Sequence, residues 1–159
     1  MKAMDAPAAE PAKPVAVFSV QRLVRFSDCD PAGMVFYPQY FVMLNGLVED
    51  WFTQALQVDY ARFLGERRLG LPTASLQCDF KVPSRMGETI ALHRRLLRQG
   101  QSSLTLGIQC TQPARPDVLR WSARAVLVTT SLEHDGSIPI PADVVQGLAR
   151  WQALSGETA

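Results

Sequence analysis

The feature that most restricts the fold of this chain is a stretch, residues 41–48, that is apolar on almost every side of a helix. Apolar side chains recur at helical spacing from Pro38 to Leu56, at Phe41, Leu44, Val48, Trp51, Phe52 and Ala55. A helix of this kind has to be buried on most of its sides. Gly46 within it costs about 1 kcal/mol relative to alanine, and we expect it to allow a close approach of backbone.

Strand patterns fill much of the remaining chain. In 75–82 and 104–111, apolar and polar residues alternate with a period of two. The predicted strands are 15–25, 75–82, 89–98, 104–111 and 119–132, the last being the longest, and the further predicted helices are 60–68 and 141–154. Short turns connect the last four strands, which indicates hairpins and an antiparallel meander. The patterns therefore predict an α+β domain with an antiparallel sheet.

The composition agrees with one globular domain, 15–159, after a disordered Ala/Pro-rich tail, 1–14; 47% of the residues are hydrophobic and 19% charged. A net charge of +1 gives no indication of nucleic-acid binding. No apolar run approaches the roughly 20 residues of a membrane span. Three cysteines without metal-ligand spacing fit a reducing compartment, so we expect a cytoplasmic protein without a metal site.

The stretch 28–40, Asp-Cys-Asp-Pro-Ala-Gly-Met-Val-Phe-Tyr-Pro-Gln-Tyr, joins the first strand to the apolar helix. The proline after Asp30 disfavours helix at that aspartate, and Gly33 permits a turn conformation that other residues resist. Pro38 suits the first position of a helix, where a missing N–H leaves no bond unmade.

A helix that starts here would direct the N–H groups around Tyr37, Gln39 and Tyr40 out of its N-terminus. That end of a helix carries about half a positive charge and favours an oxyanion. The stretch thus combines a carboxylate with an oxyanion site, the two groups that acyl transfer needs.

The same stretch resembles the active-site segment of the 4-hydroxybenzoyl-CoA thioesterase family of hotdog-fold enzymes, and the resemblance runs from about Gln21 to Val144. In that family the Asp before the turn is catalytic, which matches Asp30. The backbone N–H at the helix start polarises the thioester carbonyl, which matches Tyr37. Related Tol–Pal-associated acyl-CoA thioesterases carry His at the Tyr37 position, so this chain is nearer to the hydroxybenzoyl type.

The resemblance implies a hotdog fold, in which an antiparallel sheet wraps around one long central helix. It also implies a homodimer or homotetramer with active sites at the dimer interface. Coenzyme A would be part of the acyl-CoA substrate, and no separate cofactor is expected. The family places contacts to the CoA phosphates in a strand and turn that correspond to Arg98, Ser102 and Ser103, beside Arg94 and Arg95 in a basic patch. The alternative is that this patch is a solvated edge that only favours solubility.

Several acids compete for the catalytic role. Asp30 has a structural alternative, because an Asp before Pro can simply close an Asx turn, but the longer match favours catalysis. Asp28 either repels the charge on Asp30 or is solvated, and we favour solvation. Glu49 and Asp50 are rival carboxylates on the helix, and we expect Glu49 to be a partly exposed surface acid. Asn45 would either line the site or bond a neighbouring strand.

The other reactive side chains are expected to be structural. His93 lies in a strand and is more often a half-exposed packed residue than a base, and His134 lies in a solvated turn. The acids on both sides of Cys29 raise the pKa of its thiol, which argues against a nucleophile.

The sequence therefore predicts an acyl-CoA thioesterase in which Asp30 is the nucleophile or the general base for water. Phe36 and the aromatic residues of the helix would suit an aromatic acyl group, although aromatic side chains are also ordinary core material. A hotdog dehydratase would want His where this chain has Tyr37. The non-enzyme alternative is an acyl-CoA-binding or scaffold hotdog protein, in which Asp30 only holds the turn.

Overall fold

The computed structural model describes residues 15–156, so the predicted tail, 1–14, lies outside the described residues. In chain order the elements are β1 (Val17–Leu23), η1 (Phe26–Asp28), α1 (Tyr37–Asp50), η2 (Trp51–Ala55), α2 (Tyr60–Gly65), β2 (Leu69–Gly70), β3 (Thr73–Phe80), β4 (Thr89–Gln99), β5 (Ser103–Thr111), β6 (Trp121–Val128), β7 (Thr130–Ser131) and α3 (Ala142–Gly156).

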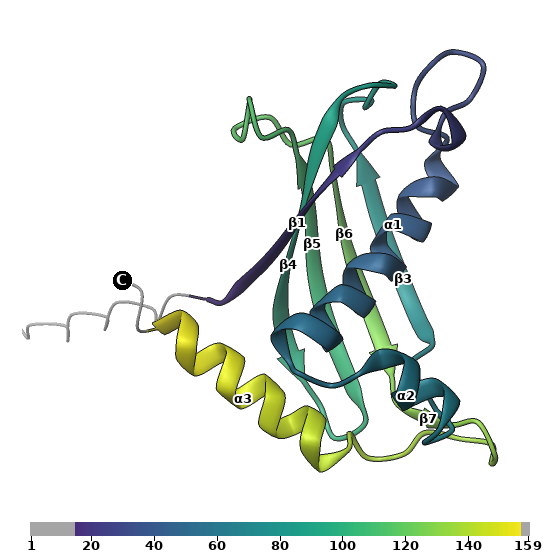
Figure 1. The fold of residues 1–159 in the computed structure, drawn as a ribbon, viewed down its shortest axis with the longest axis vertical. Helices are drawn as coiled ribbons and strands as arrows, with labels where there is room; N and C mark the ends of the chain where they lie inside the picture. The colour runs from purple at the N-terminus through teal and green to yellow at the C-terminus, as the bar shows by residue number, and fades with distance from the viewer. Residues whose placement is uncertain (1–14, 157–159) are drawn as a thin grey trace, which may run out of the picture.

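One antiparallel sheet wraps around the central helix (Figure 1). Its strand order is β1-β4-β5-β6-β3, and α1 lies across the concave face. Leu47 of α1 and Trp51 and Phe52 of η2 are fully buried in the core. The predicted α+β class and hotdog arrangement are confirmed, because the apolar run after Pro38 forms one continuous helical segment, α1 followed by the π-helical turn η2.

The prediction of a four-stranded meander is wrong in one connection. Strands β4, β5 and β6 form hairpins in sequence, but β3 pairs with β6 rather than with β4 and occupies an edge of the sheet. The segment 81–88 cannot be a hairpin turn, since it crosses from that edge to the start of β4 and bonds the loop after β1 on its way. This crossing segment is therefore part of the scaffold of the loop.

The predicted strand 119–132 is also too long. Strand β6 ends at Val128 because Thr129 is buried and its hydroxyl donates to the carbonyl oxygen of Ile138 at 2.6 Å. The chain then turns away, and β7 pairs with β2 in a separate two-stranded sheet. The longest strand is β4, with 11 residues.

Gly46 does accept a close neighbour, but the neighbour is not backbone as we expected. A Cβ at this position would lie 2.9 Å from Nη2 of Arg22, which crosses from β1 and donates to Oδ2 of Asp50 at 2.9 Å. Asp50, one of the alternative catalytic acids, therefore forms an ion pair with Arg22 that links β1 to α1.

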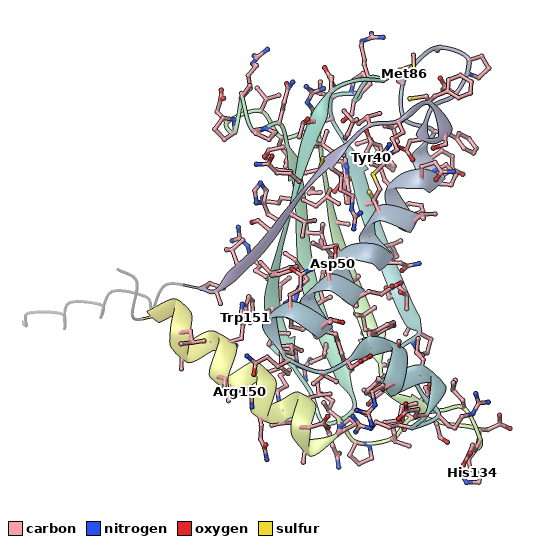
Figure 2. All side chains as sticks on the ribbon, viewed as in Figure 1. Tyr40, Asp50, Met86, His134, Arg150 and Trp151 are labelled. Atoms are coloured by element: carbon pink, nitrogen blue, oxygen red, sulfur yellow. The ribbon has the colours of Figure 1, made fainter. Side chains whose placement is uncertain are left out.

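Helix α3 covers the C-terminal end of the central helix (Figure 1). Arg150 of α3 donates from Nη2 to the carbonyl oxygen of Leu56 at 3.0 Å, and Figure 2 shows Arg150 beside Trp151 on this helix. The ring of Trp151 meets the ring of Trp51 edge-on at 5.8 Å. We find no helix among residues 15–156 that is both long and apolar enough to cross a membrane.

Arg94 does not belong to a surface patch, so this part of the predicted basic patch is wrong. The alternation of β4 places it on the core face, where its side chain is fully buried and its guanidinium carbon lies 3.0 Å from the ring centroid of Trp51. Desolvation lowers the pKa of Arg94, and the two indoles of Trp51 and Trp151 offset part of the cost of burying its charge.

Candidate functional site

The loop between β1 and α1 is a tight hairpin, residues 28–36. Cys29 forms a bridge with Val35, and the N–H of Phe36 donates to the carbonyl oxygen of Asp28 at 2.9 Å. The N–H of Asp30 donates to the carbonyl oxygen of Met34 at 2.9 Å. These bonds tie the aspartate of the turn to the residues that lead into α1.

Asp30 occupies the first position of the turn. Its Oδ1 accepts from the N–H of Ala32 at 2.8 Å, and its carbonyl oxygen accepts from the N–H of Gly33 at 3.0 Å. Gly33 has φ of 74°, the left-handed region that glycine adopts without strain. Asp30 therefore makes the Asx turn that was its structural alternative, but only Oδ1 is used in it. A carboxylate fixed through one oxygen keeps the other available for chemistry.

Tyr37 is the first residue of α1, one position before the predicted start at Pro38. The N–H of Gln39 is not free as we predicted, because it donates to the carbonyl oxygen of Phe36 at 2.8 Å. Within residues 15–156, the structure shows no acceptor for the N–H of Tyr37. An unpaired N–H at a helix N-terminus is suited to binding an oxyanion.

An apolar pocket of about 230 Å³ lies at this end of the helix and is lined by Val35, Tyr37, Tyr40, Phe80, Lys81, Val82 and Pro83. The rings of Tyr37 and Tyr40 each lie about 6 Å from the ring of Phe80, at 6.1 and 6.0 Å between centroids. Phe80 belongs to the edge strand β3, and half of its surface is exposed at 49%. The pocket is therefore aromatic and open toward the edge of the sheet.

A larger and more polar groove, about 620 Å³, runs between β1 and α1. Asp28, Gln39, Asn45 and Glu49 are among the residues that line it. The hairpin that carries Asp30 thus joins Asp28 of the polar groove to Val35 of the aromatic pocket.

The other acids lie outside the 30–33 turn that holds Asp30. Asp28 is not simply solvated, since its Oδ2 accepts from the N–H of Arg25 at 2.8 Å and holds the short helix η1. Glu49 is exposed on α1, as we expected for a surface acid. Asn45 is exposed as well and lines grooves on both sides of the helix.

The reactive side chains considered at the sequence level have structural roles. His93 bridges three strands, with Nδ1 2.7 Å from the hydroxyl of Ser19 and Nε2 2.9 Å from that of Thr111. Desolvation and the charge of Arg95 lower the pKa of His93. Desolvation and the carboxylates beside Cys29 raise the pKa of that thiol, as the sequence indicated. His134 lies exposed at the far end of the molecule (Figure 2).

The predicted phosphate contacts lie near the end of β4 that is opposite to the end where the Asp30 loop packs. The Asp30 loop packs against residues 84–88, just before β4 begins, whereas Arg98 is near the end of β4. Nine positions of strand between Thr89 and Arg98 span about 30 Å at roughly 3.3 Å per residue. Ser102 and Ser103 lie in the turn and strand that follow. A single chain therefore does not bring Arg98, Ser102 and Ser103 to Asp30.

Two residues that support the site were missed at the sequence level. Ser84 is fully buried, its carbonyl oxygen accepts from the N–H of Val35 at 2.9 Å, and its N–H donates to the hydroxyl of Tyr40 at 3.3 Å. Ser84 looked like an ordinary turn residue, and Tyr40 was considered only for its backbone N–H. Only the pairing of the 81–88 segment with the loop reveals their role.

No group of three or more His, Cys, Asp or Glu side chains within residues 15–156 is arranged to hold a metal ion. The groups that the site offers are thus a carboxylate, a helix N-terminus and an aromatic pocket.

Comparison with known proteins identifies the family. A model of the thioesterase-like superfamily matches residues 24–148. The chain belongs to this superfamily. The matched segment includes the hairpin, the central helix and all strands of the main sheet except β1.

The curated relatives of this chain share about a quarter of its residues or fewer. The chain is 25% identical to a 1,4-dihydroxy-2-naphthoyl-CoA hydrolase of Prochlorococcus marinus (strain MIT 9303), over 86% of this chain and 90% of the relative. It is 21% identical to a 4-hydroxybenzoyl-CoA thioesterase of Pseudomonas sp. (strain CBS-3), over 80% and 94%. Among solved structures, a 1,4-dihydroxy-2-naphthoyl-CoA thioesterase from Synechocystis superimposes with a TM-score of 0.76 at 19% identity, over 84% of this chain and 96% of that one.

Proposed function

We propose that this thioesterase-superfamily protein hydrolyses an acyl-CoA thioester to a carboxylate and free CoA. The observation that carries the proposal is the 28–36 hairpin, whose backbone bonds fix Asp30 relative to the first residue of α1. A carboxylate and an unpaired N–H at a helix N-terminus are then held by the same small unit. Hydrolysis needs only water as a second reactant, so no cofactor enters the proposal.

The two groups have separate roles in the proposed reaction. The N–H of Tyr37 donates to the thioester oxygen, where negative charge develops as the carbonyl is attacked. Asp30 either attacks the carbonyl carbon, giving an anhydride that water cleaves, or accepts a proton from the attacking water. In both routes the thiolate of CoA leaves and the carboxylate product forms.

The acyl group that we propose is aromatic. Phe80 and Tyr40 line the pocket beside Tyr37, and both rings lie at edge or tilted angles to their neighbours, which is how aromatic rings pack. The curated relatives named above act on aromatic acyl-CoA esters, a naphthoyl and a benzoyl ester. An aryl group inserted between these rings would extend the same packing.

The proposed assembly is a homodimer or homotetramer through the β3 edge. Nearly the whole of β3 is exposed, including Leu76 and Phe80, and Val82 follows with a further exposed apolar side chain. An unpaired edge with apolar residues is a liability that a second copy removes. The same contact would cover the open side of the aromatic pocket and complete the active site.

A two-fold axis at β3 would also explain the position of the phosphate contacts. Two copies of an antiparallel edge strand run in opposite directions, so the Arg98 end of one sheet lies toward the Asp30 end of the other. We therefore keep Arg98, Ser102 and Ser103 as proposed CoA-phosphate contacts, supplied from the partner subunit. Free Cys29, Cys78 and Cys110 agree with a reducing compartment such as the cytoplasm, which is part of the proposal.

The first test separates the two candidate acids. Asp30→Asn keeps the size and the Asx turn but removes the charge, so single-turnover hydrolysis should fall by about 10²–10⁴ if Asp30 is a general base. Glu49→Gln is the matched control and should retain activity, because Glu49 is an exposed side chain of α1. Normal turnover in folded Asp30→Asn protein would contradict the assignment. Binding of acyl-CoA without turnover by the wild type would favour a binding protein instead.

The second test removes the oxyanion donor. Tyr37→Pro deletes the N–H at the start of α1, where proline is well tolerated and the preceding Phe36 already has the extended conformation that proline requires. We expect kcat to fall about 10²–10³-fold while the melting temperature changes little. Tyr37→Phe keeps the N–H and most of the ring, and it should keep most of the activity. Equal activity of the two variants would exclude the helix N-terminus as the oxyanion site.

The third test concerns assembly. Light scattering at micromolar concentration should give at least a dimer, and Leu76→Glu on the β3 edge should shift the protein to monomer with loss of hydrolysis. Leu97→Glu is the control, since Leu97 is also exposed but lies on the interior strand β4. A fully active wild-type monomer would refute the shared active site.

The fourth test concerns the phosphates. Arg98→Ala should raise KM for the acyl-CoA far more than it lowers kcat, because a phosphate contact is similar in the ground state and the transition state. The effect should shrink with a truncated thioester that lacks the nucleotide. Arg95→Ala on the same strand is the control. An unchanged KM for the CoA ester would remove Arg98 from the site.

A further inference from the structure

The segment 81–88 forms the surface on which the Asp30 hairpin is built. The carbonyl oxygen of Ser84 accepts from the N–H of Val35 at 2.9 Å, and the N–H of Met86 donates to the carbonyl oxygen of Gly33 at 3.1 Å. Figure 2 shows Met86 and Tyr40 at this same end of the molecule. The hairpin is therefore positioned by a segment that lies roughly fifty residues further along the chain. This segment contributes no acid or nucleophile to the candidate site.

Ser84 holds the chain on both sides of Tyr37. Its carbonyl oxygen bonds Val35, two residues before Tyr37, and its N–H bonds the hydroxyl of Tyr40, three residues after. Ser84 is completely buried. The N–H of Tyr37 is thus bracketed by two bonds to one residue, so a displacement of Ser84 would move this donor.

Arg120 in turn holds the segment that contains Ser84. The residue is 7% exposed, and its Nη1 donates to the carbonyl oxygen of Pro83, the neighbour of Ser84. The same Nη1 lies 3.3 Å from Oε2 of Glu88, so one guanidinium reaches both ends of the turn. Oε2 of Glu88 also accepts from the N–H of Arg85 at 2.9 Å, which closes the turn internally.

The guanidinium of Arg120 is itself fixed. Its Nη2 donates to Oε1 of Gln112 at 2.6 Å. The backbone of Arg120 also contributes, since its carbonyl oxygen accepts from the N–H groups of Lys81 and Val82 at 2.8 and 3.0 Å. Both of these residues line the aromatic pocket. One residue therefore anchors a wall of the pocket and the turn behind the hairpin.

We propose that Arg120 is a positioning residue for the reaction: its guanidinium fixes the 83–88 turn, and through Ser84 it sets where the N–H of Tyr37 points relative to Asp30. The inference rests on the proposed function. Arg120 touches neither Asp30 nor Tyr37, so it acts on the reaction only through the turn.

A lysine cannot replace this arginine. Arginine presents five donors in a rigid planar fork, which allows simultaneous bonds to Pro83, Gln112 and Glu88. Lysine offers one compact charge on a flexible stem, which can pair with Glu88 but cannot reproduce the fork. Arg120→Lys therefore keeps the positive charge beside Glu88 but does not fix the position of the 83–88 turn. Comparing its activity with its melting temperature separates an effect on positioning from an effect on stability.

The test compares Arg120→Gln and Arg120→Lys with Arg124→Gln, which removes an exposed arginine from β6, the strand that begins directly after Arg120. We expect kcat for the best acyl-CoA to fall about 10²-fold in both Arg120 variants, the scale of a misplacement of about 1 Å, with KM nearly unchanged. Arg120→Lys should keep a near-normal melting temperature, and Arg124→Gln should behave as wild type. Unchanged kcat in folded Arg120→Lys would overturn the positioning role. The same conclusion would follow if Arg120→Lys regained both the kcat and the melting temperature that Arg120→Gln had lost.

Amide hydrogen exchange provides a readout that does not depend on turnover. Exchange at Val35 and Met86 should accelerate in Arg120→Lys, while amides in the central strand β5 should be unchanged. Unchanged exchange at Val35 and Met86 would overturn the proposal even if kcat fell. If wild-type protein hydrolyses no acyl-CoA, the proposed function fails, and the exchange measurement still decides whether Arg120 holds the hairpin.

Discussion

The backbone bond from Phe36 to Asp28 closes the hairpin on which the site depends. With the bridge between Cys29 and Val35, it fixes the turn that carries Asp30 directly against the start of α1. Neither the hairpin nor the start of α1 is stable in this position by itself. A nine-residue hairpin is marginal in water, and a helix N-terminus leaves donors unsatisfied. The 81–88 segment supplies the missing support through Ser84, and the buried helix supplies a rigid base. The proposed chemistry therefore depends on long-range packing, although its two groups are only seven positions apart in sequence.

The features predicted correctly from the sequence are those that local patterns specify. The apolar stripe after Pro38 specifies the central helix, and the alternation around Cys78 and Ile108 specifies strands. The prediction that this helix is buried on most of its sides is wrong for its outer face, where Val42 is 62% exposed. Gly33 specifies a turn that needs a positive φ. Each of these depends on residues within a few positions of one another. The placement of Asp30 and Tyr37 on one unit was likewise available from the motif.

The features that the sequence could not predict are set by distant contacts. The pairing of β3 with β6 depends on a crossing segment, 81–88, whose sequence is that of an ordinary turn. Arg94 reads as a surface residue among other arginines, yet its guanidinium packs on the ring of Trp51, a partner far away in the sequence. The separation of Arg98 from Asp30 depends on the direction of β4, and short-range patterns contain no such information. Arg120 similarly has no local signal, because its partners Pro83 and Glu88 lie on another part of the chain.

The central claim is that the N–H of Tyr37 polarises the thioester carbonyl in a site where Asp30 supplies the attacking or proton-accepting oxygen. The most direct measurement is the infrared stretching frequency of a ¹³C-labelled thioester carbonyl bound to the inactive Asp30→Asn protein. We predict a lower frequency than in water, because a fixed donor at a helix N-terminus weakens the carbonyl bond, and loss of the shift when Tyr37→Pro is added. A bound thioester with no shift, or with the same shift in both proteins, would contradict the claim.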